Sequence, residues 1–178
     1  GQPFPPSAIA AKDVKVFIEE DDKPDFVATA QPRAMSHDDI KQVINEYRQA
    51  ARNAVDAGFD GIELHAANGY LINQFIDSES NQRTDEYGGS LENRLRFLQQ
   101  VTQAVCDEIG AERVGVRLAP LTTLNGTVDD NPFDTYIGAA KVLHHLNVAY
   151  LHIAEADWDA APLMEQTFKQ ATHEHTAG

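Results

Sequence analysis

Three polar side chains lie within six residues of one another near the middle of the sequence: His65, Asn68 and Tyr70. His65 and Asn68 are hydrogen-bond donors, suited to a carbonyl or phenolate oxygen that gains negative charge. Tyr70 offers a phenolic proton and is therefore a candidate general acid. A structural interpretation is also open, in which His65 and Asn68 satisfy loop carbonyls and Tyr70 packs. The spacing of so short a motif does not separate the two interpretations.

Strands that alternate with helices are the elements expected to position these side chains. His65 ends a short strand predicted from Gly61, and the turn that follows carries Asn68 and Tyr70. Other elements are expected as a hairpin over 13–30, strands over 113–118 and 148–153, and helices over 36–57, 90–109, from Asp134, and over 161–171. This alternation is typical of parallel βαβ units.

Two architectures contain such units, an open doubly wound sheet and a closed (β/α)₈ barrel. No glycine-rich phosphate loop follows any predicted strand, which weakens the dinucleotide-binding version of the open sheet. The candidate residues instead follow a strand end, the usual place of a barrel active site. A closed barrel needs about 250 residues and eight strands, whereas these 178 residues contain three legible core strands. Periodicity alone leaves part of a barrel and a small open sheet as alternatives.

Composition narrows the class of protein. The formal net charge is −14, from 14 Lys and Arg against 28 Asp and Glu, so phosphate backbones are repelled and no nucleic-acid partner is expected. No apolar run approaches 18 residues, so no membrane span is expected. The single cysteine, Cys106, excludes a disulfide framework and favours a cytoplasmic location. The neighbouring histidines in the sequence have too few other ligands nearby to complete a zinc site, so no metal is expected.

A longer pattern surrounds the three polar residues. Residues 65–75 read HAANGYLINQF, and residues 80–94 read SNQRTDEYGGSLENR. Together these segments resemble the Old Yellow Enzyme family of flavin enzymes nearly without gaps. The resemblance extends to TAQPRAM at 29–35, VGVRLAP at 114–120 and YLHI at 150–153, and it covers nearly the whole chain.

The resemblance implies an α/β fold, in which residues 1–178 form a single, incomplete (β/α)₈ TIM-barrel domain with about three core strands. The hairpin at 13–30 would be an excursion that caps the mouth of the active site, and residues 171–178 match nothing in the family. It also implies an FMN-dependent ene-reductase, which uses NADPH or NADH to reduce the C=C bond of α,β-unsaturated carbonyl compounds. Enones, quinones and phenols are the ligands to expect.

The resemblance also assigns roles to individual residues. His65 and Asn68 would hold the carbonyl oxygen of the substrate, stabilising the enolate-like charge that develops. Tyr70 would be the proton donor, since a phenol keeps its proton at neutral pH. Arg117 would lie beside the flavin, where a permanent cation stabilises the reduced form. Residues 81–94 are expected to be scaffold, with Arg83, Asp85 and Arg94 holding the loop by ion pairs.

The segments that bind the FMN phosphate in the family have no counterpart in this sequence. The enzymatic interpretation therefore needs the remaining barrel segments or a second copy of the chain. The alternative is a catalytically silent, truncated barrel fragment that self-associates, because open sheet edges demand pairing.

Overall fold

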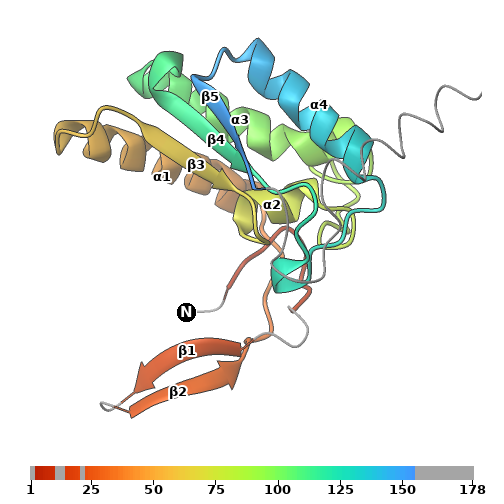
Figure 1. The fold of residues 1–178 in the computed structure, drawn as a ribbon. Helices are drawn as coiled ribbons and strands as arrows, with labels where there is room; N and C mark the ends of the chain where they lie inside the picture. The colour runs from red at the N-terminus through yellow and green to blue at the C-terminus, as the bar shows by residue number, and fades with distance from the viewer. Residues whose placement is uncertain (1–2, 11–14, 21–22, 155–178) are drawn as a thin grey trace, which may run out of the picture.

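A parallel sheet lies at the centre of the computed structural model, which describes residues 3–10, 15–20 and 23–154 (Figure 1). Its strands are β3 (Ile62–Ala66), β4 (Val114–Leu118) and β5 (Tyr150–Ile153). Their order in space equals their order in the chain, and both pairs are parallel. The predicted βαβ alternation is confirmed, whereas the helix expected over 161–171 and the tail at 171–178 lie outside the described residues.

Three long helices cover one face of this sheet (Figure 1): α1 (His37–Asp56), α3 (Leu91–Ile109) and α4 (Pro132–His145). The strand side chains that point toward them are almost fully buried: Leu64, Ala66, Val114, Val116 and Leu118. They join one core with the apolar stripes of the helices, and this burial is the main source of the fold's stability.

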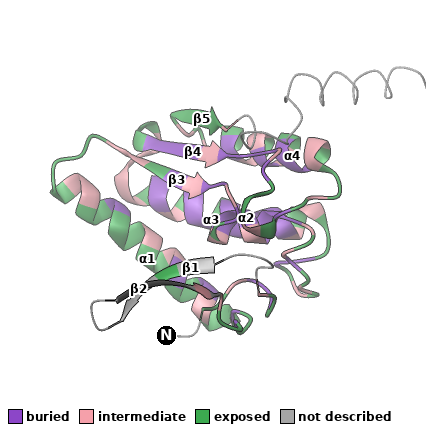
Figure 2. Ribbon diagram, turned by 60° about the horizontal axis from the view of Figure 1, so that its bottom comes forward, coloured by how far each residue is buried: buried purple, intermediate pink, exposed green. Residues whose placement is uncertain are grey.

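The other face of the sheet carries the alternate residues, because side chains of a strand point to opposite faces in turn. Glu63 is exposed, while His65 and Arg117 are half-buried. All four residues of β5 are exposed, and this strand is green in Figure 2. The sheet therefore has an apolar, helix-covered face and a polar face that no described helix covers.

Side-chain caps set the helix ends much as the sequence predicts. The Asp39 amide donates to Ser36 Oγ at 3.1 Å, and the Ser36 amide donates to Asp39 Oδ2 at 2.8 Å. This reciprocal capping box starts α1. Ser90 caps α3 with a single bond, in which its Oγ accepts the Asn93 amide at 3.3 Å. Gly110 ends α3 with a φ of 91°, a conformation that glycine adopts without strain.

Two predicted boundaries were wrong. The loop expected after β3 contains a six-residue helix, α2 (Leu71–Ile76), which has no side-chain cap at its start. Helix α4 begins at Pro132 rather than Asp134, because Asn131 is the N-cap and Pro132 occupies the first turn, where proline is tolerated. Short 3₁₀ turns, η1 (Ala111–Arg113) and η2 (Leu124–Gly126), flank β4.

The predicted hairpin is present as two antiparallel strands. β1 (Lys15–Glu20) pairs with β2 (Lys23–Ala28), with Lys15 opposite Ala28. It lies apart from the central sheet in Figure 1, and its role as a cap over the active-site mouth stays a prediction. Within the described residues, no helix has the length and apolar content needed to cross a membrane.

Candidate active site

The turn after β3 brings the first three candidate residues together. His65 stands in the strand and Tyr70 is the N-cap of α2, with Asn68 and Gly69 between them in the left-handed conformation, at φ of 57° and 75°. This double reversal folds the chain back, so that the His65 and Tyr70 rings are 5.0 Å apart between centroids. Tyr70 is 56% exposed, leaving its hydroxyl open to a ligand.

A loop from the next strand approaches the same turn. Asn125, in η2, donates its side-chain N–H to the Asn68 carbonyl oxygen at 2.7 Å. A Cβ on Gly69 would meet Asn125 Cβ and the Leu124 carbonyl oxygen at 2.6 Å each, so only glycine allows this close approach. The loops that follow β3 and β4 therefore form one packed surface at the carboxyl end of the sheet.

Arg117 stands beside His65 on the polar face. The strand register pairs His65 with Arg117, and Arg117 with His152, so the three side chains form a row across the sheet. Burial and the positive charge of Arg117 lower the pKa of His65. His65 is therefore a neutral imidazole at neutral pH, able to donate one N–H to an acceptor.

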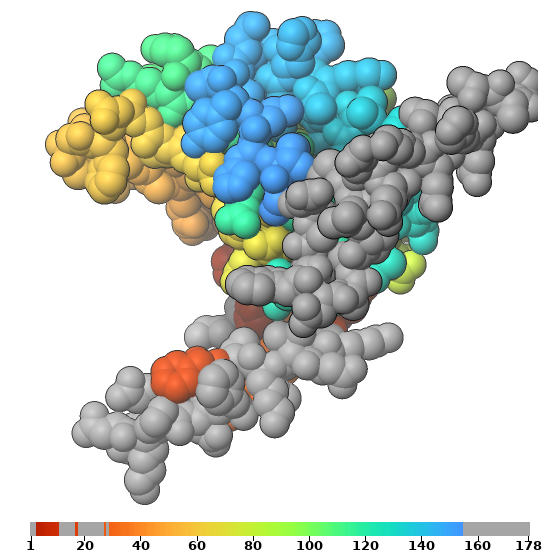
Figure 3. All heavy atoms as spheres, viewed as in Figure 1, coloured from red at the N-terminus to blue at the C-terminus, as the bar shows by residue number. Residues whose placement is uncertain are grey.

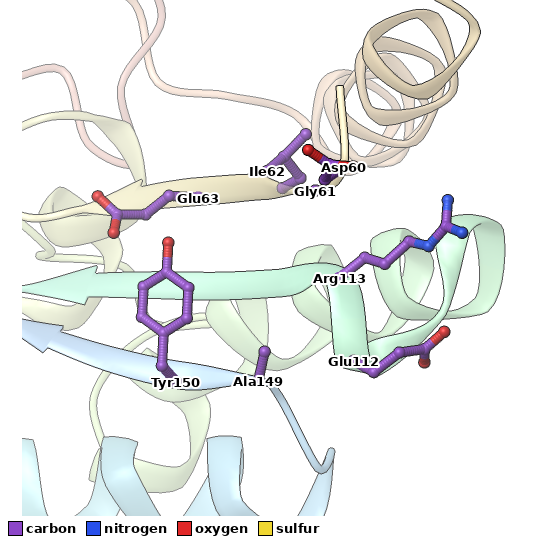
Figure 4. A pocket seen from close by; sticks show the side chains of 8 residues that line it. All are labelled: Asp60, Gly61, Ile62, Glu63, Glu112, Arg113, Ala149 and Tyr150. Carbon is purple, nitrogen blue, oxygen red and sulfur yellow. The ribbon is translucent and has the colours of Figure 1, made fainter. Parts of the chain in front are cut away.

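Glu63 and His152 belong to this face, and the sequence reasoning did not assign them a role. His152 Nδ1 lies 3.1 Å from Glu63 Oε2. Gly115 lies between Glu63 and Tyr150 in the strand register, and the Tyr150 ring occupies the space that a Cβ on Gly115 would need. Tyr150 points toward Glu63 (Figure 4). Alternation along the strands was the available signal, since each of these residues lies two positions from a neighbour on the same face.

Arg117 carries a polar atom without a partner. Its Nε is buried and makes no hydrogen bond within the described part of the chain. A buried donor is normally paired, because leaving it unpaired costs free energy. Arg117 stands near the carboxyl end of β4, on the face that no described helix covers. Figure 3 views the molecule from the side on which the atoms of β5 lie in front. A planar ligand with an acceptor atom, such as the pyrimidine edge of a flavin, would suit a guanidinium with an unpaired Nε.

A separate hollow of about 380 Å³ lies at the other end of the strands (Figure 4). Asp60, Glu112, Arg113 and Ala149 line it, and they come just before or at the start of the three strands. Active sites of barrels lie at the carboxyl ends of the strands. The hollow at the amino ends is therefore not assigned to the His65–Tyr70 site.

Comparison with known proteins decides the family. Residues 6–177 match the family described as "NADH:flavin oxidoreductase / NADH oxidase family". The chain belongs to this family. The Old Yellow Enzyme resemblance and the partial (β/α)₈ barrel are thereby confirmed.

Individual relatives give the extent of the match. The "Probable flavin mononucleotide-dependent alkene reductase" of Leishmania infantum is 49% identical over 127 residues, which are 71% of this chain and 35% of that protein. "Morphinone reductase" superposes with a TM-score of 0.90 and 41% identity, over 98% of this chain and 47% of that one. "Structure of morphinone reductase in complex with tetrahydroNAD" gives a TM-score of 0.84 and 45% identity, over 87% and 43%. The chain spans about a third of the length of the curated relatives and about half of these solved structures.

The family segment at 81–94 makes the expected ion pairs, with one difference. Arg83 binds Asp85 at 2.5 Å and donates to the Met35 carbonyl oxygen at 2.6 Å, which ties the loop to the start of α1. Arg94 does not pair within the loop. Its partner is Asp129 at 2.8 Å, which follows β4 and lies 35 residues further along the chain.

One group of possible metal ligands lies beside that loop. His37, Asp85 and Glu86 place their ligand atoms within 4.8 Å of one another. His37 Nε2 lies 3.4 Å from the Asp85 carboxylate and 3.2 Å from that of Glu86. Asp85 is already held by Arg83. These contacts explain the cluster as side chains that bind one another and Arg83, and the expectation of no metal stays a prediction.

Proposed function

We propose that the protein containing this chain is an FMN-dependent NAD(P)H oxidoreductase that reduces the C=C bond of α,β-unsaturated carbonyl compounds. The observation that supports the proposal is that Tyr70 and Arg117 both lie beside His65, with Asn68 in the turn between His65 and Tyr70. This reaction needs three kinds of group from the protein. They are hydrogen-bond donors for the carbonyl oxygen of the substrate, a proton donor for its α-carbon, and a fixed cation beside the flavin.

His65 and Asn68 would bind the carbonyl oxygen of the substrate. Burial and the charge of Arg117 lower the pKa of His65 and so favour its neutral imidazole, which donates an N–H to the oxygen. Negative charge grows on that oxygen as the double bond is reduced, so both hydrogen bonds strengthen in the transition state. Phenols present a similar oxygen, which supports their use as ligands.

Tyr70 would deliver a proton to the α-carbon. Its exposed ring lies beside His65, close enough for one small molecule to touch both residues. The proton leaves the phenolic oxygen as the enolate-like intermediate collapses to the saturated carbonyl compound, and solvent restores it.

FMN is the cofactor that the family implies, and when bound it supplies the hydride that reaches the β-carbon. Arg117, with its unpartnered Nε, would hold the flavin edge that becomes negative on reduction. A nicotinamide reductant is supported by the tetrahydroNAD complex of morphinone reductase. Both NADH and NADPH remain candidates. Cytoplasmic location remains a prediction that rests on composition.

The remaining barrel strands would complete the site. β3 and β5 are the outer strands of the described sheet, each with a neighbour on one side only. Since the chain spans about half of the solved relatives, further barrel segments, or a second copy, would pair with these edges and supply the phosphate site.

The test is to purify the full-length protein that contains this chain and record its visible spectrum. We expect a yellow protein that releases FMN on denaturation and oxidises NADH or NADPH when an enone such as 2-cyclohexenone is added. A colourless protein that takes up no FMN would refute the proposal. If residues 1–178 expressed alone were colourless and eluted as an oligomer, the silent, self-associating fragment would be the better description of this chain.

A further inference from the structure

A buried amide lies directly beneath the turn that carries Asn68 and Tyr70. Asn73, in α2, is 1% exposed, and both polar atoms of its side chain are used. Asn73 Oδ1 accepts the Gly69 N–H at 2.9 Å, and Asn73 Nδ2 donates to the Tyr136 hydroxyl at 3.1 Å. Sequence reasoning assigned no role to Asn73 or Tyr136.

The Asn73 bond and the Asn125 bond act on the same peptide group. The carbonyl of Asn68 and the amide of Gly69 are the two ends of one peptide plane. Asn125 donates to that carbonyl at 2.7 Å, and Asn73 accepts from that amide at 2.9 Å. A planar peptide held at both ends keeps one orientation, although Asn68 is in the left-handed conformation, which is uncommon for residues other than glycine.

The next peptide is held as well. Gln74 donates its side-chain N–H to the Gly69 carbonyl oxygen at 2.7 Å. The Tyr70 amide donates to the Ala67 carbonyl oxygen at 3.2 Å. The backbone on both sides of Gly69 is therefore fixed, which fixes the Cα–Cβ directions of Asn68 and Tyr70.

Tyr136 extends the contact to α4, 63 residues away in the sequence. It is 7% exposed, and burial raises the pKa of its phenol well above the ordinary range. Tyr136 therefore stays protonated and serves as a fixed hydrogen-bond partner. Its oxygen accepts the Asn73 Nδ2 proton and anchors that end of the amide, while the Gly69 N–H requires Oδ1 to face the turn.

We infer that Asn73, oriented by Tyr136, is a positioning residue that holds the Asn68–Gly69 peptide and thereby aims Asn68 and Tyr70 at the substrate. The effect of Asn73 on proton transfer rests on the proposed function, whereas its effect on the conformation of the turn does not. A shift of about 1 Å in a reacting group can lower a rate about 100-fold, so a buried residue that touches no substrate controls the proton transfer.

The structural consequence is measured by amide hydrogen exchange in the purified protein, with no substrate and no dependence on flavin. Asn73→Ala removes the acceptor of the buried Gly69 amide, and we expect exchange at Gly69 and Tyr70 to become faster. Asn81→Ala is the matched control, because Asn81 is 4% exposed and its amide donates at 2.7 Å to the Phe75 and Tyr87 carbonyls instead. Equal protection of Gly69 in Asn73→Ala and the unaltered protein would overturn the inference.

The catalytic consequence is measured by a double-mutant cycle. Asn73→Ala should slow the reoxidation of reduced flavin by enone about 100-fold in the otherwise unaltered protein. In a Tyr70→Phe background the same change should have an effect several-fold smaller, because the group that it aims is gone. Equal effects in both backgrounds, or an equal effect of Asn81→Ala, would assign Asn73 a general structural role and overturn the inference.

Tyr136→Phe provides a milder second variant if Asn73→Ala does not fold. It leaves Asn73 in place and removes only the oxygen that orients the amide, so Gly69 exchange should rise less than in Asn73→Ala but more than in Asn81→Ala. If the protein holds no FMN, the proposed function fails and the exchange comparison still decides whether Asn73 holds the turn.

Discussion

Leu118 and Arg117 are neighbours in β4, yet they stand in opposite environments. Leu118 is 1% exposed beneath the helices, whereas Arg117 stands on the face that no described helix covers and keeps a buried, unpartnered Nε. The same contrast occurs in β3, where Leu64 is 3% exposed and the adjacent His65 is half-buried. One strand therefore supplies stability with one set of alternate side chains and candidate chemistry with the other. The two properties should be separable by single substitutions.

The largest expected effect is on the helix-covered face. Leu118→Ala removes a side chain from a packed core, and we expect a loss of about 2–5 kcal/mol in the free energy of unfolding. Arg117→Met, one residue away, should change that free energy little, since the unpartnered Nε makes no bond to lose. It should instead abolish or weaken FMN binding. Chemical denaturation and flavin titration of both variants measure the two effects, and a similar loss of stability in both variants would break the comparison.

A second contrast lies within the polar face itself. Tyr70→Phe should slow enone reduction by about 100-fold or more, because a general acid contributes at least that factor, while flavin reduction by NAD(P)H and phenol binding are spared. His65→Ala should instead weaken phenol binding about tenfold, because it removes a hydrogen bond to a charged oxygen. Stopped-flow kinetics and phenol titrations separate the two. Unchanged phenol affinity in His65→Ala would contradict its role at the oxygen.

The sequence predicts the parts of this site that depend on local pattern. The strand predicted from Gly61 to His65 is observed over Ile62–Ala66, and the helix predicted over 36–57 is observed over His37–Asp56. Helix α2 was missed because six residues are too few to show a helical period, and Tyr70 gives it no side-chain cap. The motif from Asn68 to Tyr70 is visible in the sequence, but the reason for its shape is not.

Contacts between distant segments account for the rest. Three hydrogen-bonded pairs are far apart in the sequence: Asn73 and Tyr136 by 63 residues, Arg94 and Asp129 by 35, and Glu63 and His152 by 89. No local propensity encodes these pairs, since each depends on the packing of whole elements. Arg94 illustrates the limit that follows: the sequence indicates that this arginine forms an ion pair, but it does not identify Asp129, in the segment after β4, as the partner.

The smallest expected effect concerns the scaffold loop and shows as a dependence on pH. Hydrogen bonds from Arg83, together with the Tyr87 amide, hold the pKa of Asp85 below its ordinary value. The unfolded chain therefore takes up the proton first as the pH falls, so the contribution of Asp85 to stability is full above about pH 4 and is lost below it. The ion pair is partly exposed, so we expect at most about 1 kcal/mol.

Thermal unfolding between pH 7 and pH 3 measures this contribution. Asp85→Asn should lower the melting temperature at pH 7 and lose its difference from the unaltered protein below about pH 4. Asp38→Asn is the control, since its carboxylate is 96% exposed and its ion pair with Lys41 is 3.9 Å long. A difference for Asp85→Asn that stayed constant across the whole pH range would mean that the loop is held by hydrogen bonds that do not depend on the Asp85 charge, such as the 2.6 Å bond from Arg83 to the Met35 carbonyl oxygen.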